Sequence, residues 1–196
     1  VAASPASFQP VKAARSTASF STGCSLHSTC STKKRLSADQ AIRTMGISTK
    51  DRAMPIEISI CESVDETVVA AFERLMPQLS TSSLFPTTEQ LLEILNHDAS
   101  TVLLAREGET IVGSMTLVVF PIPTGVRAWI EDVVVDEQAR GRGVGEALNK
   151  RAIEIAIEAG AKTIDLTSRP SRAAANRLYQ RLGFVARETN IYRYEA

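Results

Sequence analysis

An apolar, strand-like run passes directly into a glycine-rich helix start in residues 129–148, which read WIEDVVVDEQARGRGVGEAL. The apolar run ends at Val135, and an amphipathic helix opens at three glycines, Gly141, Gly143 and Gly145. Glycine lets the backbone approach a ligand closely, and the first turn of a helix presents unpaired, partially positive N–H groups. The segment is therefore suited to bind a pyrophosphate.

Two familiar phosphate-binding patterns do not fit this glycine spacing. A dinucleotide-binding Gly-x-Gly-x-x-Gly needs a third glycine where Glu146 or Leu148 stands. A Walker loop needs Gly-Lys followed by Ser or Thr, which the segment lacks. The spacing that is present is Arg140-x-x-Gly143-x-Gly145. A structural alternative stays open, in which the glycines only make a tight turn from strand to helix.

Around this segment, residues 54–196 alternate between strand-like and helix-like periods. We expect four helices, over 63–79, 88–96, 143–159 and 172–182, with Ser63 as the N-cap of the first and Ser171 as the N-cap of the last. We expect strands over 56–60, 101–105, 110–119, 128–135 and 163–167, and one or two closing strands in 184–195. This order predicts an α/β or α+β domain on one mixed sheet. Ligands of such sheets bind at the carboxyl ends of parallel strands, which places the candidate crevice between the strands ending at Val135 and Thr167.

The glycine spacing resembles the coenzyme A pyrophosphate loop of the GCN5-related N-acetyltransferase (GNAT) family, which follows the pattern Gln or Arg, x, x, Gly, x, Gly or Ala. Residues 173–184, AAANRLYQRLGF, resemble the closing motif of that family, a helix that carries Leu-Tyr and ends in Gly-Phe. The likeness covers residues 54–196 and is strongest over 130–184. It implies an α/β (α+β) GNAT-like fold with a mixed, mostly antiparallel sheet of six to seven strands flanked by about four helices.

The resemblance also implies acetyl-CoA as cosubstrate and no metal. The acetyl group is expected to pass directly to a primary amine of a small molecule or peptide. Family members bind pyrophosphate and pantetheine at positions that correspond here to Arg140, Gly141, Arg142, Gly143, Val144 and Gly145, and to the main chain of Val133, Val134 and Val135. Asn176 is a further candidate for cofactor binding. Many members, however, carry their asparagine at the position of Arg172.

Acyl transfer from a thioester to an amine needs a base for the amine and an acid for the leaving sulfur. The resemblance assigns the acid to Tyr179, and the alternative is a core aromatic residue with its hydroxyl at the surface. The base is a carboxylate or an ordered water. Neighbours on a strand point to opposite faces, so only one of Glu131 and Asp132 faces the thioester easily. We favour Glu131, because placing Asp132 on the face of Ile130 and Val134 leaves Glu131 nearer the sheet opening. Alternatively, both carboxylates are rim charges that attract a cationic substrate.

The overall charge of zero hides a difference between two segments. Residues 54–196 carry 14 basic and 20 acidic side chains, and this excess of acid favours a positively charged acceptor. Residues 1–53 are rich in Ser, Thr and Ala and have no acidic residue before Asp39. We expect 1–53 to be disordered, as a tag-like or upstream segment or a transit-like peptide, and 54–196 to be the acyltransferase domain.

Cys24, Cys30 and Cys61 form no CxxC pair, which argues against a zinc or disulfide framework. We therefore expect a cytoplasmic protein, or an organellar one if residues 1–53 are a transit peptide, with Cys61 as a buried thiol. Neither a spanning helix nor a basic patch interleaved with aromatic residues is evident, so we expect no membrane or nucleic-acid partner. A homodimer is compatible with the resemblance. The alternative function is a non-catalytic module that binds or senses acetyl-CoA.

Overall fold

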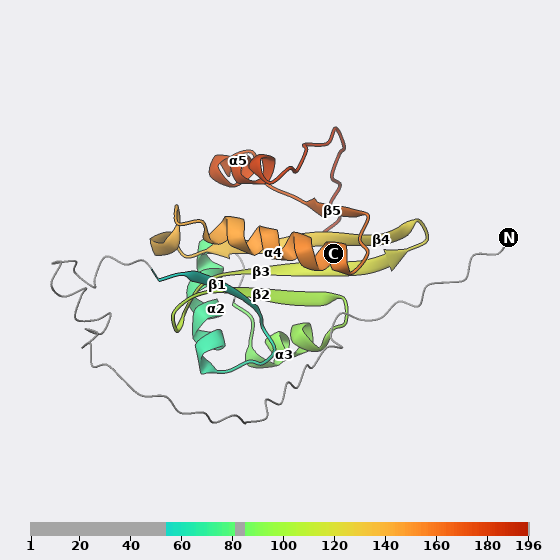
Figure 1. The fold of residues 1–196 in the computed structure, drawn as a ribbon. Helices are drawn as coiled ribbons and strands as arrows, with labels where there is room; N and C mark the ends of the chain where they lie inside the picture. Colours follow the sequence, from blue (N-terminus) through green and yellow to red (C-terminus); the bar gives the residue numbers. More distant parts are fainter. Residues whose placement is uncertain (1–53, 81–84, 196) are drawn as a thin grey trace, which may run out of the picture. The chain divides into compact units, whose positions relative to one another are not determined.

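The computed structural model describes residues 54–80 and 85–195 of the 196-residue chain. These residues form one five-stranded sheet with the order β1-β2-β3-β4-β5 (Figure 1). Its strands are β1 (Ile56–Ile60), β2 (Ser100–Glu107), β3 (Thr110–Ile122), β4 (Gly125–Val135) and β5 (Thr163–Leu166). The first four strands are antiparallel neighbours, and β5 runs parallel to β4. The predicted mixed, mostly antiparallel sheet is confirmed.

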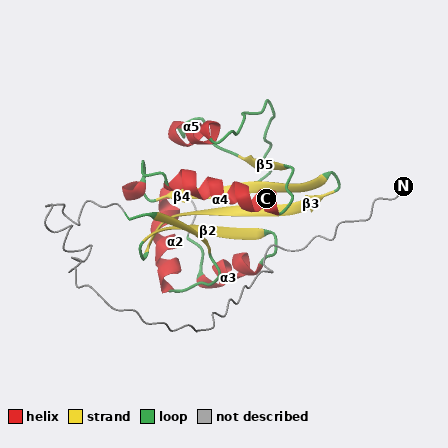
Figure 2. Cartoon of the chain, in the orientation of Figure 1, coloured by secondary structure: helices red, strands yellow, loops and turns green. Residues whose placement is uncertain are grey.

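Helices cover both faces of the sheet (Figure 2). They are α2 (Glu66–Leu79), α3 (Thr88–Asn96), α4 (Val144–Glu158) and α5 (Ala173–Arg181), with a short 3₁₀ turn η1 (Glu137–Ala139) before α4. Successive residues of β2 point to opposite faces, so Leu103 packs with α4 and Leu104 with α2 and α3. Both leucines are almost fully buried, and the sheet therefore has an apolar layer on each side.

Both predicted serine N-caps were wrong, and in each case the local hydrogen bonds differ from the expected ones. The helix expected from Ser63 begins at Glu66, because the Asp65 carboxylate accepts the Val68 N–H at 2.9 Å. The helix expected after Ser171 has Arg172 as its N-cap, with no side-chain cap bond. The helix over 88–96 is confirmed and opens on a capping box between Thr87 and Gln90.

The sheet has five strands in the described part of the chain, rather than the predicted six to seven. Residues 184–195 form no strand there, although their pattern predicted one or two. A strand needs a hydrogen-bonded neighbour as well as a suitable sequence. The apolar side chains of this segment lie exposed instead, with Val185 at 83% and Tyr194 at 93%.

Cys61 is buried at the end of β1, as predicted, and its Sγ donates to the Ser63 carbonyl at 3.3 Å. Burial raises the pKa of this thiol, which suits a packing role. The predictions for residues 1–53, with Cys24 and Cys30, lie outside the described residues. No helix within 54–80 or 85–195 combines the length and apolarity needed to cross a bilayer.

Candidate active site

The two parallel strands separate toward their carboxyl ends. β4 and β5 are paired from Arg127 and Thr163 to Ile130 and Leu166, but β4 continues to Val135. Among the described residues, the last five positions of β4 therefore have no strand neighbour on the β5 side. Strand backbone without a partner strand offers N–H and C=O groups to an extended ligand. This is the place where the sequence predicted a crevice.

A β-bulge interrupts the other edge of β4 at the same point. Met115 of β3 lies opposite two residues of β4, Asp132 and Val133. Asp132 has a φ of 52°, the only positive φ of a non-glycine residue in the described part of the chain. Such a bulge adds one residue to the strand and changes the direction of the side chains around it. The simple alternation assumed for Glu131 and Asp132 is therefore broken.

A cavity of about 720 Å³ lies beside the bulge. It is lined by all three predicted catalytic residues, Glu131, Asp132 and Tyr179, and by Val133. Because the bulge breaks the alternation, both Glu131 and Asp132 line the cavity, and which of the two carboxylates faces the thioester stays a prediction. The other lining groups come from the later half of α2, from α3 and the connection between these helices, from β2 and β3, from the β5–α5 connection and from the C-terminal segment. Sequence reasoning pointed to the first two helices for specificity but named none of these individual residues, since they follow no common motif.

Glu131 is held by a neighbour that sequence reasoning missed. The indole Nε1 of Trp129 donates a hydrogen bond to Glu131 Oε1 at 2.5 Å. The two residues are two positions apart on β4, so their side chains share a face of the strand. That spacing was a signal that the sequence contained. The contact fixes one carboxylate oxygen and leaves the other available.

Tyr179 lies partly buried in α5 with its ring against Phe184. The ring centroids are 5.9 Å apart at an interplanar angle of 71°, an edge-to-face contact. Burial raises the pKa of the Tyr179 hydroxyl, and the nearby charge of Arg172 offsets part of that rise. The hydroxyl is therefore protonated at neutral pH, as a proton donor must be.

The start of α4 is open on its N-terminal side. Gly143 is the N-cap with a φ of 84°, and Gly141 has a φ of 78°, both in the left-handed region that favours glycine. A Cβ built on either residue meets no atom within 4 Å. No side chain caps the helix at Gly143. The first turn of α4 thus has no side-chain cap and open space beside its two leading glycines, which fits a bound phosphate group.

Gly145 has a different role from the two glycines before it. A Cβ at Gly145 would lie 3.2 Å from Leu178 Cδ2, so this glycine lets α5 pack closely on the first turn of α4. The side chains of Val134 and Val144 are buried in the core. If these valines bind a ligand, they do so through main-chain groups.

Both arginines of the loop already contact protein groups. Arg142 Nη1 forms an ion pair with Glu107 Oε1 at 2.7 Å, and Arg140 Nε donates to the Val135 carbonyl at 3.3 Å. Each guanidinium keeps further N–H donors. The arginines therefore brace the loop, and their contribution to anion binding stays a prediction.

Asn176 and Arg172 hold the connection between β5 and α5. Asn176 Nδ2 donates to the Arg169 carbonyl at 3.1 Å, and Arg172 Nη2 donates to the Leu79 carbonyl at 3.0 Å. The second bond ties the start of α5 to the end of α2. The cofactor contact expected of Asn176 stays a prediction, because its amide nitrogen already serves the fold.

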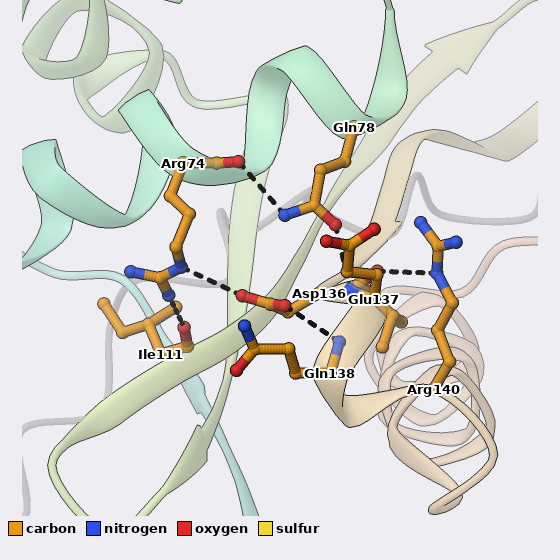
Figure 3. Close-up of polar contacts among 8 residues, drawn as sticks. Arg74, Gln78, Ile111, Asp136, Glu137, Gln138 and Arg140 are labelled. Carbon is orange, nitrogen blue, oxygen red and sulfur yellow. Dashed lines mark hydrogen bonds and ion pairs between the residues drawn. The ribbon is translucent and has the colours of Figure 1, made fainter.

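A polar network joins α2 to the connection between β4 and α4 (Figure 3). Arg74 Nε pairs with buried Asp136 at 2.9 Å, and its Nη2 donates to the Ile111 carbonyl. Gln78 accepts the Glu137 N–H at 2.9 Å. Burial alone raises the pKa of Asp136, but the Gln138 N–H and the Arg74 guanidinium outweigh it and lower that pKa below its ordinary value.

The sequence model of the acetyltransferase (GNAT) family matches residues 67–184, which include the bulge, the glycine loop and Tyr179. The chain belongs to this family. The match covers more than half of the chain and all of the cavity-lining strands β2 to β4. In the described residues, no group of three or more His, Cys, Asp or Glu side chains is placed to bind a metal ion.

Known GNAT-family relatives and folds are similar to parts of the chain. It is 32% identical over 103 residues to glucosamine 6-phosphate N-acetyltransferase 1 of Oryza sativa subsp. japonica, which is 53% of this chain and 58% of that protein. It is 38% identical over 68 residues, 35% of each chain, to N-alpha-acetyltransferase MAK3 of Arabidopsis thaliana. The chain thus spans about a third to somewhat over half of the length of these curated relatives.

The fold is also found in solved structures of other proteins. An aminoglycoside acetyltransferase from an uncultured soil metagenomic sample, crystallised with trehalose, superposes with a TM-score of 0.64. The match covers 72% of this chain and 95% of that one at 21% sequence identity. At this identity the likeness establishes the fold alone.

Proposed function

We propose that the protein is an N-acetyltransferase that moves the acetyl group of acetyl-CoA directly to a primary amine of a small molecule or peptide. The observation that carries the proposal is the convergence of Glu131, Asp132 and Tyr179 on one cavity, at the point where β4 separates from β5. Bound acetyl-CoA supplies an activated acetyl group as a thioester.

The chain offers two backbone surfaces for the cosubstrate. The N–H groups at Gly143, Val144 and Gly145 lie at a helix N-terminus that no side chain caps, and they would bind the pyrophosphate. The edge of β4 at residues 133–135 has no strand neighbour on the β5 side, although the Val135 carbonyl accepts from Arg140 Nε, and it would bind the extended pantetheine arm as an added strand. Because both surfaces are main chain, they bind the cosubstrate without needing particular side chains.

Two side chains would then move protons. The amine must be neutral to attack the acetyl carbon, and Glu131 or Asp132 would accept its proton directly or through water. Tyr179, which is protonated at neutral pH, would give its hydroxyl proton to the sulfur as the carbon–sulfur bond breaks. The attack forms the carbon–nitrogen bond, and release of the coenzyme A thiol completes the transfer. Main-chain N–H groups near the bulge would stabilise the charge on the carbonyl oxygen.

The test is release of free coenzyme A thiol from acetyl-CoA by the full chain, measured with a panel of amines. The names of the rice and Arabidopsis relatives support including amino sugars and peptide N-termini, beside amino acids, polyamines and aminoglycosides. We expect thiol release that depends on one class of amine and yields the N-acetyl product. Reactions without amine measure background hydrolysis.

A non-catalytic acetyl-CoA sensor is the competing function. It would bind acetyl-CoA by calorimetry but release no thiol with any amine in the panel. That pair of results would contradict the proposal of an enzyme while leaving the family assignment intact.

A further inference from the structure

The cavity beside the bulge carries charges of both signs. Its acidic lining residues are Glu131 and Asp132 of β4 and Glu93 of α3. Three arginines line the same cavity, two from the β5–α5 connection and one from the C-terminal segment: Arg169, Arg172 and Arg193. Three carboxylates and three guanidinium groups leave the lining without net charge. A purely cationic amine would leave the arginines unmatched, which argues for an acceptor with both signs of charge.

The three arginines differ in whether their guanidinium groups already bind other protein groups. Arg172 donates to the Leu79 carbonyl at 3.0 Å and acts as a brace between α5 and α2. The backbone of Arg169 is fixed, because its carbonyl accepts from Asn176 Nδ2 at 3.1 Å and from the Arg172 N–H at 3.0 Å. Its guanidinium has no hydrogen bond or ion pair with the described residues, and the same holds for Arg193. A fixed backbone with an unpaired guanidinium suits recognition of an anion.

The position of these arginines separates them from the pyrophosphate loop. No residue of the 140–148 segment lines the cavity, whereas the proposed acid Tyr179 and both proposed bases do. Arg169 and Arg193 therefore share a cavity with the reacting groups and not with the phosphate-binding helix start. Their charge is available to the acceptor.

We propose that the acceptor is a small primary amine that also carries an anionic group, a carboxylate or a phosphate, bound by Arg169 and Arg193 while the amine faces Glu131 and Asp132. The proposal rests on the function proposed above and narrows its substrate class. A cavity of about 720 Å³ has room for a molecule of this size beside the end of the pantetheine arm.

The experiment compares matched amines that differ only in the anionic group. Glucosamine 6-phosphate against glucosamine tests a phosphate, and phenylalanine against phenylalaninamide tests a carboxylate. We expect kcat/KM to be higher for the anionic member of at least one pair by about 10- to 100-fold, as for a hydrogen-bonded charge. Equal or better use of both members that lack the anionic group would overturn the proposal.

Arg169→Gln and Arg193→Gln then test the assigned residues. Each is expected to reduce the preference for the anionic amine by about tenfold through KM for the acceptor, with KM for acetyl-CoA unchanged. Arg177→Gln is the matched control, since this exposed arginine lies on α5 and does not line the cavity. If the two variants raise KM for acetyl-CoA instead, the arginines bind the cosubstrate and the proposal is wrong.

A binding measurement tests the proposed acceptor class separately from the proposed enzymatic activity. The chain saturated with coenzyme A is titrated by calorimetry with the same four amines. Tighter binding of an anionic member, lost in Arg169→Gln, supports the acceptor class even if no thiol is released. If thiol release proceeds but neither anionic amine binds more tightly, the acceptor class fails and the enzymatic function stands.

Discussion

At the start of α4 the candidate binding groups belong to the main chain, whereas in the cavity beside the β4 bulge they belong to side chains. The helix start is one continuous segment in which two glycines with positive φ open the first turn. The cavity is assembled from α2, α3, β2, β3, β4, the β5–α5 connection, α5 and the C-terminal segment. The first arrangement suits a ligand common to a family, and the second suits an acceptor that varies from one protein to the next.

The largest effect on activity is expected for a side chain that lines the cavity. Tyr179→Phe removes the hydroxyl proton but keeps the ring contact with Phe184. We expect kcat to fall by about 100-fold or more, as for loss of a general acid, with acetyl-CoA affinity unchanged. Thiol release and calorimetry measure the two quantities. Tyr192→Phe is the control at an exposed tyrosine, and an unchanged kcat in Tyr179→Phe would remove this residue from the mechanism.

The main-chain binding groups at the start of α4 are tested by Gly143→Asp. A side chain here must adopt a φ of 84° and places a negative charge at the helix N-terminus where the pyrophosphate is expected. We expect acetyl-CoA affinity to fall by at least about tenfold in calorimetry.

Gly160→Asp is the matched control for this variant, because Gly160 follows the other end of α4 with a φ of 78° and open space around it. It carries a similar backbone strain far from the helix N-terminus. Equal loss of acetyl-CoA affinity in both variants would mean that strain, and not a lost binding site, explains the result.

The two carboxylates can be ranked by isosteric changes. Glu131→Gln keeps an oxygen for the Trp129 indole but no longer accepts a proton. We expect it to lower kcat by about tenfold, with a smaller effect of Asp132→Asn. Steady-state kinetics of both variants at neutral pH measure the ranking. The opposite order would assign the base to Asp132, and no effect of either would leave both as rim charges.

The Arg74–Asp136 network joins the cavity to the start of α4, because it links α2, which lines the cavity, to the segment that precedes α4. Asp136→Asn leaves the Arg74 guanidinium without its carboxylate partner. We expect the free energy of unfolding to fall by about 2 kcal/mol in urea denaturation at neutral pH. A change below about 0.5 kcal/mol would show that the pair contributes no more than an exposed ion pair.

The same network predicts how this stability difference depends on pH. The pKa of Asp136 is lowered in the folded protein, so its contribution is complete above the ordinary value of 3.8 and is lost as pH falls through the folded pKa. Urea unfolding of the wild type and Asp136→Asn should therefore converge as the pH falls below that value. A difference that stays constant into strong acid would contradict the lowered pKa.

The sequence was informative where function depends on local spacing and uninformative where it depends on assembly. The glycine loop and the helix with Tyr179 were recognisable because each is one segment with a fixed spacing. The bulge at Asp132 was not predictable, since it depends on the register between β3 and β4. Arg169 and Arg193 were missed for the same reason, because 24 positions separate them in the chain and only the fold brings them to one cavity.

The wrong predictions of helix N-caps and closing strands also have identifiable structural causes. Ser63 and Ser171 were reasonable N-caps by residue type, but Asp65 provided a competing carboxylate and Arg172 needed no side-chain cap. The closing strands expected in 184–195 required a neighbour strand that the alternation of apolar residues does not itself specify. Element type was therefore easier to predict than element boundaries or pairing.

Calorimetric titration of the full 196-residue chain with acetyl-CoA tests the central claim most directly. The open first turn of α4 and the unpaired edge of β4 predict saturable binding of one molecule per chain, weakened by Gly143→Asp and retained in Gly160→Asp. A folded chain that shows no saturable heat with acetyl-CoA or coenzyme A would contradict the account.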